Sequence, residues 1–245
     1  MSHKLELLEG ACIISDAHYS KTRVELLSLI KDIASKKLLP SQLILMGDVF
    51  DALFGEIQHT HNENSEIIKL INEISLEIEV LYLEGNHDFN LMDIFPKAKV
   101  IAFAQQPISC KFKNQSVSLA HGDFDIGFLY KLYTLLIRSS AVLLFLKFIN
   151  AMSNNAILKE LDRHLAKKED CNEFDGFREY IQNRSLQKYE SDCFIEGHYH
   201  QNIAFNFDNF NYINLAAFAC NQRYFIVKSS QDNKLVLEEK SYKEI

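Results

Sequence analysis

Five short clusters of aspartate, asparagine, histidine and glycine constrain this sequence more than any other feature. In chain order they are Asp16-Ala17-His18, Gly47-Asp48-Val49-Phe50-Asp51, Gly85-Asn86-His87-Asp88, His121-Gly122-Asp123 and Gly197-His198-Tyr199-His200. Each cluster follows a short apolar run of the kind that forms a buried strand. Strand ends at the carboxyl edge of an α/β sheet commonly build a ligand site. We therefore expect the clusters to lie on loops at strand ends and to form one site.

The pattern of strands and helices predicts a layered α/β protein. Apolar runs predict strands in the first half at 11–14, 42–46, 78–83, 99–103, 108–113 and 116–120, the last two forming a hairpin. Helices are expected from Thr22 to about Lys37 and over 65–74. Helical spacing then fills 125–190, and strands return at 193–196, 203–207, 212–215, 224–227 and 234–238. We expect one domain over residues 1–245, with two sheets packed between helices and a helical insertion at about 125–190.

Composition excludes several classes of protein. With 47% apolar and 24% charged residues in 245, the chain is neither disordered, collagenous nor a coiled coil. The net charge of −7 argues against binding to nucleic acid. Five cysteines without a C-x-x-C motif argue against a disulfide framework or zinc ribbon and fit a reducing compartment. Glu6 and Glu9 interrupt the apolar run near the N-terminus, so we expect no signal peptide. Charged residues divide the apolar stretch at 128–149 too often for a membrane-spanning helix.

The residue types in the clusters point to bound metal. Five of the nine histidines lie in the clusters, and four of the eight glycines adjoin a cluster Asp, Asn or His. Carboxylate and imidazole without thiolate suit manganese, iron or zinc. Each cluster alone has an ordinary explanation, such as a turn or a helix cap. Together they predict a two-metal site, whereas His59 and His61 fall in a polar loop and are expected to be solvated.

The ordered set D-x-H, G-D-x-x-D, G-N-H-D, a later His-Gly and G-H-x-H resembles the calcineurin-like metallophosphoesterases over about residues 11–220. The resemblance implies a four-layer α-β-β-α sandwich and two divalent metal ions, with manganese expected and iron or zinc as alternatives. It implies that Asp16, His18 and His200 bind the first ion. By the same resemblance Asn86, His121 and His198 bind the second ion, and Asp48 bridges both.

The same resemblance assigns catalytic and supporting roles. His87 would donate a hydrogen bond or proton toward the phosphoryl or leaving oxygen. Asp51 would orient His87, as a carboxylate commonly orients an imidazole. Asp88 and Asp123 would support the ligands from behind.

The insertion between His121 and His198 is the feature that bears on the substrate. Residues 128–150 carry three positive charges and no acid in a protein that is acidic overall. One explanation is helical packing onto the core; the other is an amphipathic lid whose apolar face meets acyl chains or a bilayer, with basic residues beside it. The basic residues that could meet a phosphate are Lys131, Arg138, Lys147, Arg163 and Lys167, although a solvated helix face explains the later ones as well.

The clusters at 47–51, 85–88 and 121–123, followed by the helical insertion at about 125–190, are similar to those of the UDP-2,3-diacylglucosamine diphosphatases of lipid A biosynthesis. That resemblance implies cleavage of a diacylated sugar nucleotide to UMP and an acylated sugar 1-phosphate. It also implies a cytoplasmic enzyme, peripheral on the inner membrane, with no nucleic acid or protein partner inferred. The main branch of those enzymes has Arg where this chain has His87. The alternatives are a phosphoesterase with another substrate, or a binding scaffold of the same fold.

Overall fold

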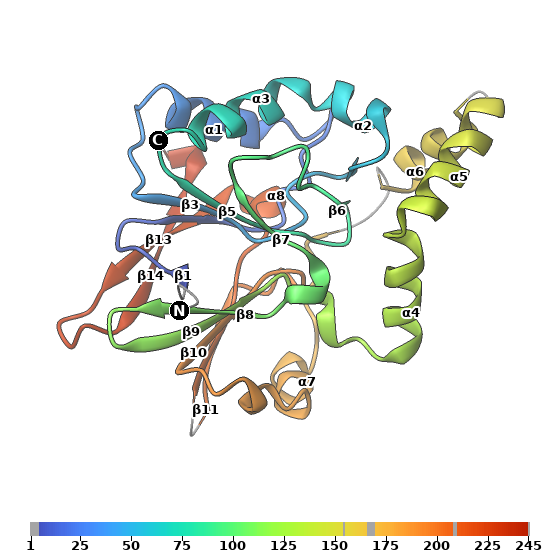
Figure 1. Ribbon diagram of the computed structural model, residues 1–245. Coiled ribbons are helices and arrows are strands. Elements are labelled where there is room, and N and C mark those ends of the chain that lie inside the picture. The colour runs from blue at the N-terminus through green and yellow to red at the C-terminus, as the bar shows by residue number, and fades with distance from the viewer. Residues whose placement is uncertain (1–4, 154, 166–169, 208–209, 245) are drawn as a thin grey trace.

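Two mixed six-stranded sheets form the centre of the computed structural model (Figure 1), which describes residues 5–153, 155–165, 170–207 and 210–244. In sheet order, the first sheet consists of β14 (Leu235–Ser241), β13 (Arg223–Ser229), β2 (Cys12–Ile14), β3 (Gln42–Leu45), β5 (Glu79–Leu83) and β7 (Lys99–Ile101). The second consists of β1 (Leu5–Glu6), β8 (Ile108–Phe112), β9 (Gln115–Ala120), β10 (Cys193–Glu196), β12 (Phe210–Asn214) and β11 (Ile203–Phe207). A short ribbon pairs β4 (Leu53–Phe54) with β6 (Asp88–Phe89).

Parallel strands bring the ends that carry the clusters to one side of the molecule. Strands β2, β3, β5 and β7 are parallel in the first sheet, and β9, β10 and β12 are parallel in the second. Every residue of β2, β3 and β10 is buried, which explains why these strands, apart from Gln42 and Glu196 at their ends, consist of continuous rather than alternating apolar residues. The predicted strands all form, and β8 and β9 make the predicted hairpin.

Three buried clusters separate four layers. Ile14, Leu43 and Tyr82 of the first sheet pack against α1 (Glu25–Ala34) and α3 (Ser65–Ile74). Neighbouring residues on the same strands, such as Ile13 and Ile44, face the second sheet instead. The outer face of the second sheet packs against α7 (Phe177–Asn183). The period-two alternation of the strands therefore builds the expected α-β-β-α sandwich, which Figure 1 shows edge-on.

Two local predictions were wrong. The first helix begins at Glu25 rather than Thr22, because Ser20 and Arg23 pair through both backbone N–H groups in a tight turn. The polar segment with His59 and His61 is a helix, α2 (Gln58–Glu63), and not a loop. Thr60 is buried at its first turn, where its hydroxyl donates to the carbonyl of Ile57. Tertiary contacts at this position override a sequence of weak helix formers.

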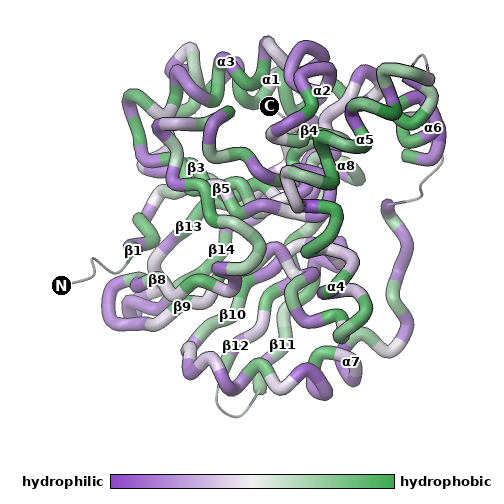
Figure 2. The backbone as a smooth tube through the Cα atoms, turned by 45° about the vertical axis from the view of Figure 1, so that its right-hand side comes forward, coloured by the Kyte–Doolittle hydropathy of each residue, from purple (hydrophilic) through white to green (hydrophobic). Residues whose placement is uncertain are grey.

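The insertion stands beside the sandwich as a cap, defined here as α4 (Phe128–Ile137), α5 (Ser140–Met152) and α6 (Ala156–Leu165). Figure 2 shows that much of α4 and α5 is hydrophobic. Few of these side chains are buried: Thr134 in α4, and Leu143 and Asn150 in α5. Packing onto the core therefore does not explain their apolar character. No single described helix is long and apolar enough to cross a membrane; α4 and α5 together are, but they are bent by 63°.

The chain returns from the cap through an extended segment that begins at Asp170 and is joined to the body by a disulfide bond. Cys171 pairs with Cys220 of the short helix α8 (Phe218–Asn221), while the other three cysteines are buried and free. Pairing across 49 residues could not be read from cysteine spacing. The cysteine pattern alone fits a protein in a reducing compartment. Because disulfides are rare in such compartments, the Cys171–Cys220 bond removes that argument.

Reduction of this bond should destabilise the protein. Closing a 49-residue loop is worth about 4 kcal/mol in the chain-entropy model. We expect Cys220→Ser, or dithiothreitol added to the wild type, to lower the free energy of unfolding by about 2–4 kcal/mol in urea titrations. Dithiothreitol should leave the Cys220→Ser variant unchanged. Alkylation of five rather than three thiols in denatured, non-reduced protein would show that the bond does not form.

Candidate metal centre

The five sequence clusters meet where the two sheets come together. Asp16 and His18 follow β2, Asp48 and Asp51 follow β3, and Asn86 and His87 follow β5. From the second sheet, His121 follows β9, and His198 and His200 follow β10. Each side chain therefore extends from the carboxyl end of a parallel strand, as the sequence predicts.

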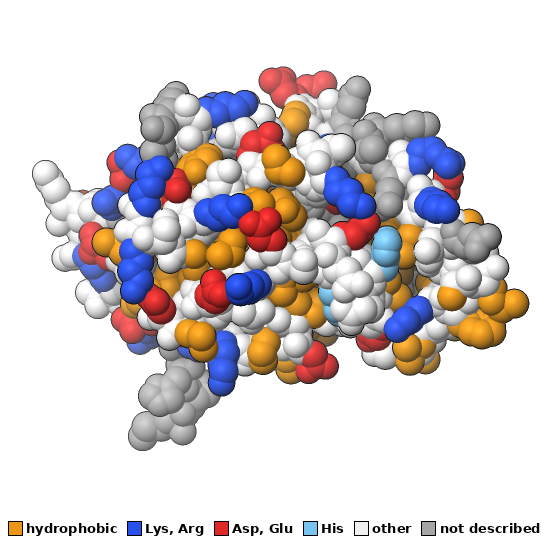
Figure 3. All heavy atoms as spheres, turned by 90° about the horizontal axis from the view of Figure 1, so that it is seen from above, with side chains coloured by type: hydrophobic (Ala, Val, Ile, Leu, Met, Phe, Trp, Pro, Cys, Tyr) orange, Lys and Arg blue, Asp and Glu red, His pale blue; other side chains and the backbone are white. Residues whose placement is uncertain are grey.

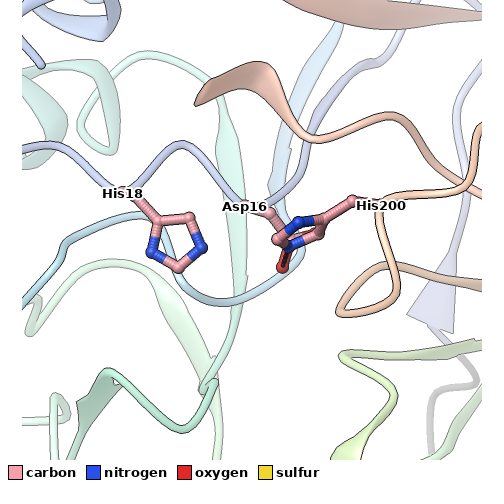
Figure 4. Close-up of side chains that lie close together, drawn as sticks. All are labelled: Asp16, His18 and His200. Atoms are coloured by element: carbon pink, nitrogen blue, oxygen red, sulfur yellow. Dashed lines mark ion pairs between the residues drawn. The ribbon is translucent and has the colours of Figure 1, made fainter. Parts of the chain in front are cut away.

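Asp16, His18 and His200 form a first ligand group (Figure 4). One potential ligand atom from each lies within 4.8 Å of the others. Asp16 Oδ1 is 3.2 Å from His200 Nε2, and the His18 and His200 rings are 5.7 Å apart between centroids. All three residues are buried or nearly so, so an ion held here would be largely removed from bulk water.

Asp48, His121 and His198 form a second group with the same spacing. Asp48 Oδ2 is 3.5 Å from His121 Nε2, and the amide oxygen of Asn86 is 3.3 Å from the same nitrogen. The rings of His121 and His198 are 5.0 Å apart. The backbone N–H of His198 donates to both oxygens of Asp16, which links the second group to the first.

The residues present fit bound divalent ions. Among the described residues, the buried His18 makes no hydrogen bond: Nδ1 lies 3.3 Å from Asp51 Oδ1 without hydrogen-bond geometry, and Nε2 has no partner. This is an expensive state for a polar group unless a ligand binds it. His121 Nδ1 is 3.0 Å from the carbonyl of Met46, and His200 Nδ1 contacts the carbonyl of Asp170. If these nitrogens carry the protons, each Nε2 is free to ligate, the usual arrangement of metal-binding histidine.

Backbone strain is concentrated at this site. Five of the seven expected ligands have φ between 46° and 63°, namely Asp16, His18, Asp48, His198 and His200. Non-glycine residues in this region cost of order 1 kcal/mol each and persist where the surroundings enforce them. Gly85 approaches Asp48 so closely that a Cβ atom at Gly85 would overlap the Asp48 carboxylate. The glycines beside the clusters therefore let backbone pass close to the ligands.

Opposite charges in the site shift the pKa values of its histidines in different directions. Burial alone lowers the pKa of His121, but the adjacent Asp48 carboxylate overrides this and raises it well above its ordinary value. Burial likewise opposes, and Asp16 causes, the raised pKa of His200. Burial and the charge of His121 lower the pKa of His198 to about 3. Without metal, two imidazoles thus act as cationic partners for the carboxylates, and the third is neutral.

Asp88 shapes the loop that carries Asp48. Its carboxylate accepts hydrogen bonds from the backbone N–H groups of Asp48, Val49 and Gly85, and from the hydroxyl of Tyr82 at 2.7 Å. Burial, and next the charge of Asp48, raise its pKa to about 7.

Asp123 is also buried and accepts a hydrogen bond from Tyr130 of α4. Both residues lie behind the ligands, where the resemblance puts them.

The arrangement of Asp51 differs from the expectation. The Asp51 backbone carbonyl, not its carboxylate, is 2.9 Å from His87 Nδ1. The carboxylate instead points to His18, with Oδ1 3.3 Å from His18 Nδ1. His87 Nε2 lies 4.0 Å from Asp48 Oδ2, so its ring still borders the second group. Asp51 therefore contacts a metal ligand as well as the expected proton donor.

A cavity of about 560 Å³ leads from this site into the cap. Asp51, Asn86 and His87 line its inner end, and side chains of α4, α5 and α6 line the rest. His59, for which the sequence predicts simple solvation, and His164, for which it supports no expectation, also line it. Figure 3 shows histidine side chains at the junction between body and cap, with hydrophobic side chains gathered at the cap end.

The basic residues of the insertion have different surroundings. Lys147 lines the cavity, Lys131 is exposed on α4, and Arg163 pairs with Glu160 in solvent. Arg138 is nearly buried, donates to the carbonyl of Gly85 at 2.8 Å and stacks on Phe103, so it joins the cap to the metal loop. Lys167 lies outside the described residues. Contact of any of them with substrate stays a prediction.

Sequence reasoning missed Arg23 and Asp170. The two side chains form an ion pair next to Asp51 and His200. Neither belongs to a cluster, and they are 147 residues apart. No local pattern could have indicated that they meet.

The geometry agrees with comparisons to known proteins. The family model of the calcineurin-like phosphoesterases matches residues 11–202. The chain belongs to this family. It is therefore a metal-dependent hydrolase of a family that uses two metal ions, and the two ligand groups are the candidate positions for them.

Two curated relatives from Pseudomonas fluorescens are both named UDP-2,3-diacylglucosamine hydrolase. The protein of strain Pf0-1 is 30% identical over 113 residues, or 45% of each chain, so this match spans less than half of that relative. The protein of strain SBW25 is 24% identical over 197 residues, covering 77% of this chain and 78% of the relative. A solved dimetal phosphatase from Danio rerio is similar in fold, with a TM-score of 0.50, 13% identity and coverage of 94% and 95%.

Metal binding should release protons. His121 and His200, whose pKa values are raised, must lose their protons before an ion can bind, whereas His198 is already neutral. Affinity for Mn²⁺ should therefore rise with pH across the neutral range, by about tenfold per pH unit for each proton released. Calorimetry in buffers of different protonation enthalpy counts these protons. Binding without proton release would contradict the proposed ion pairs.

Proposed function

We propose that this enzyme hydrolyses the pyrophosphate of UDP-2,3-diacylglucosamine to UMP and 2,3-diacylglucosamine 1-phosphate, the lipid X step of lipid A biosynthesis, with two ions, preferably Mn²⁺. The cavity carries the proposal. With a total volume of about 560 Å³, it joins the candidate metal centre at one end to a largely apolar space within the cap at the other. A substrate that occupies both ends needs a phosphoryl group and a long hydrophobic part. The names of the two curated relatives support the same substrate.

The lining of the cavity suits acyl chains. Away from the metal groups it is formed largely by aliphatic and aromatic side chains: Phe54, Ile57, Phe89, Tyr133, Ile137, Leu143, Leu146, Ile157, Leu158, Leu161 and Leu165. Burial of a methylene group contributes about 0.8 kcal/mol, so acyl chains would supply much of the binding energy. A compact polar phosphoester would leave this surface unused.

The chain's own residues explain how hydrolysis would be catalysed. Bound divalent ions supply charge neutralisation and an acidified water for in-line displacement at phosphorus. Asn86 and His87 face the same end of the cavity, where His87 is placed to donate toward a phosphoryl or leaving oxygen. The Asp51 carbonyl orients the His87 ring, and side chains of the cap form a wall of the cavity next to it. A departing sugar phosphate is a good leaving group and needs little protonation, so His87 serves this reaction chiefly by holding the phosphoryl group.

We also propose that the cap binds the inner face of the cytoplasmic membrane. Its outer surface exposes Phe128, Leu129, Phe145, Phe148 and Met152, each between 62% and 79% accessible. Helices α4 and α5 contain basic residues and no acid. Exposed apolar side chains beside lysines, here Lys131 and Lys147, are typical of surfaces that bind anionic bilayers. Such docking would bring the cavity next to a membrane-borne substrate.

The substrate proposal is tested by UMP release from UDP-2,3-diacylglucosamine in detergent micelles with added Mn²⁺. Asp48→Ala should abolish activity. Leu146→Glu places a charge in the cavity wall and should lower kcat/KM for the lipid at least about tenfold, while cleavage of a chromogenic phosphodiester is retained. Leu39→Glu, the same change at an exposed loop residue, is the control. Cleavage of the diester without any UMP release would overturn the lipid substrate and keep the hydrolase.

Membrane binding is tested separately by sedimentation with vesicles of anionic phospholipid. Phe145→Ser with Phe148→Ser should weaken binding at least about tenfold, because each removes a large apolar side chain from the contact. Leu39→Ser should bind like the wild type. Equal binding of the phenylalanine variant and the wild type would refute docking through the cap.

A further inference from the structure

Arg23 bridges two carboxylates beside the first ligand group. Its Nη1 atom contacts Asp170 Oδ2 and lies 3.9 Å from Asp51 Oδ1. The Asp170 and Asp51 side chains are only 3% and 14% exposed, and that of Arg23 is 26% exposed. Since these acids are poorly solvated, the shared cation offsets a repulsion that water would screen weakly.

Both acidic residues contact imidazole ligands of the first group, Asp51 through its carboxylate and Asp170 through its backbone carbonyl. Asp51 Oδ1 is 3.3 Å from His18 Nδ1. On the other side, the backbone carbonyl of Asp170 contacts His200 Nδ1, so that His200 Nε2 lies 3.2 Å from Asp16 Oδ1. The Arg23–Asp170 pair is therefore connected to His18 through Asp51, and to His200 through the backbone carbonyl of Asp170.

Covalent and backbone contacts hold Asp170 in this place. The next residue, Cys171, is bonded to Cys220 of α8. At the start of α8, the N–H of Phe218 donates to the carbonyl of Ser15 at 2.9 Å, and that of Ala219 to the carbonyl of Asp16 at 3.1 Å. The point where the chain returns from the cap is thus attached to the loop that bears the first ligand.

We propose that Asp170 and Arg23 are positioning residues of the first metal group. Together they fix the orientation of His200 and His18 through contacts with ring nitrogens that do not face the other ligands, and so set the affinity of that group for its ion. Partners of this kind are typically worth 10–100-fold in metal affinity. The proposal rests on the metal centre alone and is independent of the lipid substrate.

The test is Mn²⁺ titration of metal-free protein by calorimetry and electron paramagnetic resonance. Asp170→Asn removes the negative charge of the side chain and keeps the backbone carbonyl that contacts His200. Arg23→Gln removes the positive charge. Each should weaken one of the two Mn²⁺ sites by about 10–100-fold and leave the other unchanged. The double variant should lose no more Mn²⁺ affinity than the single variant with the larger loss, since both substitutions break the same ion pair. Arg23→Lys should restore part of the affinity.

Further variants assign the loss and control for general damage. In a His198→Ala background, where the second group is broken, Asp170→Asn should still weaken the remaining site. Glu66→Gln breaks an exposed ion pair with Lys31 and should bind Mn²⁺ like the wild type. The metal-free variants should unfold within about 2 °C of the wild type, a shift small for a chain of this size.

Two outcomes would overturn the proposal. Unchanged Mn²⁺ affinity with a raised KM for substrate would mean that Arg23 contacts the substrate directly. Equal weakening of both sites, accompanied by a lower unfolding temperature without metal, would mean that the pair only supports the fold.

Discussion

Buried carboxylates facing imidazoles are the constraint on which the rest of the structure depends. Asp48 lies 3.5 Å from His121, and Asp16 lies 3.2 Å from His200, all in surroundings with little water. Charged groups can be buried only when they are paired and hydrogen-bonded. The backbone pays for this arrangement with left-handed conformations at most of the ligands.

Each of the two sheets contributes ligand residues to the same edge of the molecule. The first sheet positions Asp16, Asp48 and Asn86, and the second positions His121 and His198. The two groups assigned to the metal ions each combine residues from both sheets, whereas a third close group, His18, Asp51 and His87, comes from the first sheet alone. Packing between the sheets therefore determines the ligand geometry. The cap adds a cavity that begins at the site, with a polar inner end and largely apolar walls.

Much of the site was predictable because its residues are local to strand ends. The period and apolarity of the strands indicated where each loop begins, and scarce histidine and glycine marked which loops carry chemistry. Other details depended on contacts between distant segments. The carboxylate of Asp51 turned to His18 rather than His87, and His59 and His61 lie on a helix instead of a loop. Tertiary packing decides such orientations, and no local rule contains it.

The sequence by itself determined the layered α/β fold, the edge at which the clusters meet and their metal-binding character. These follow from side-chain periodicity and from the chemistry of single residues. Only the tertiary structure decided that Arg23 and Asp170 meet, that Cys171 pairs with Cys220, and that the cap leaves a cavity rather than packing on the core. The reason is physical: such contacts join residues tens or hundreds of positions apart, and their formation depends on how whole layers pack.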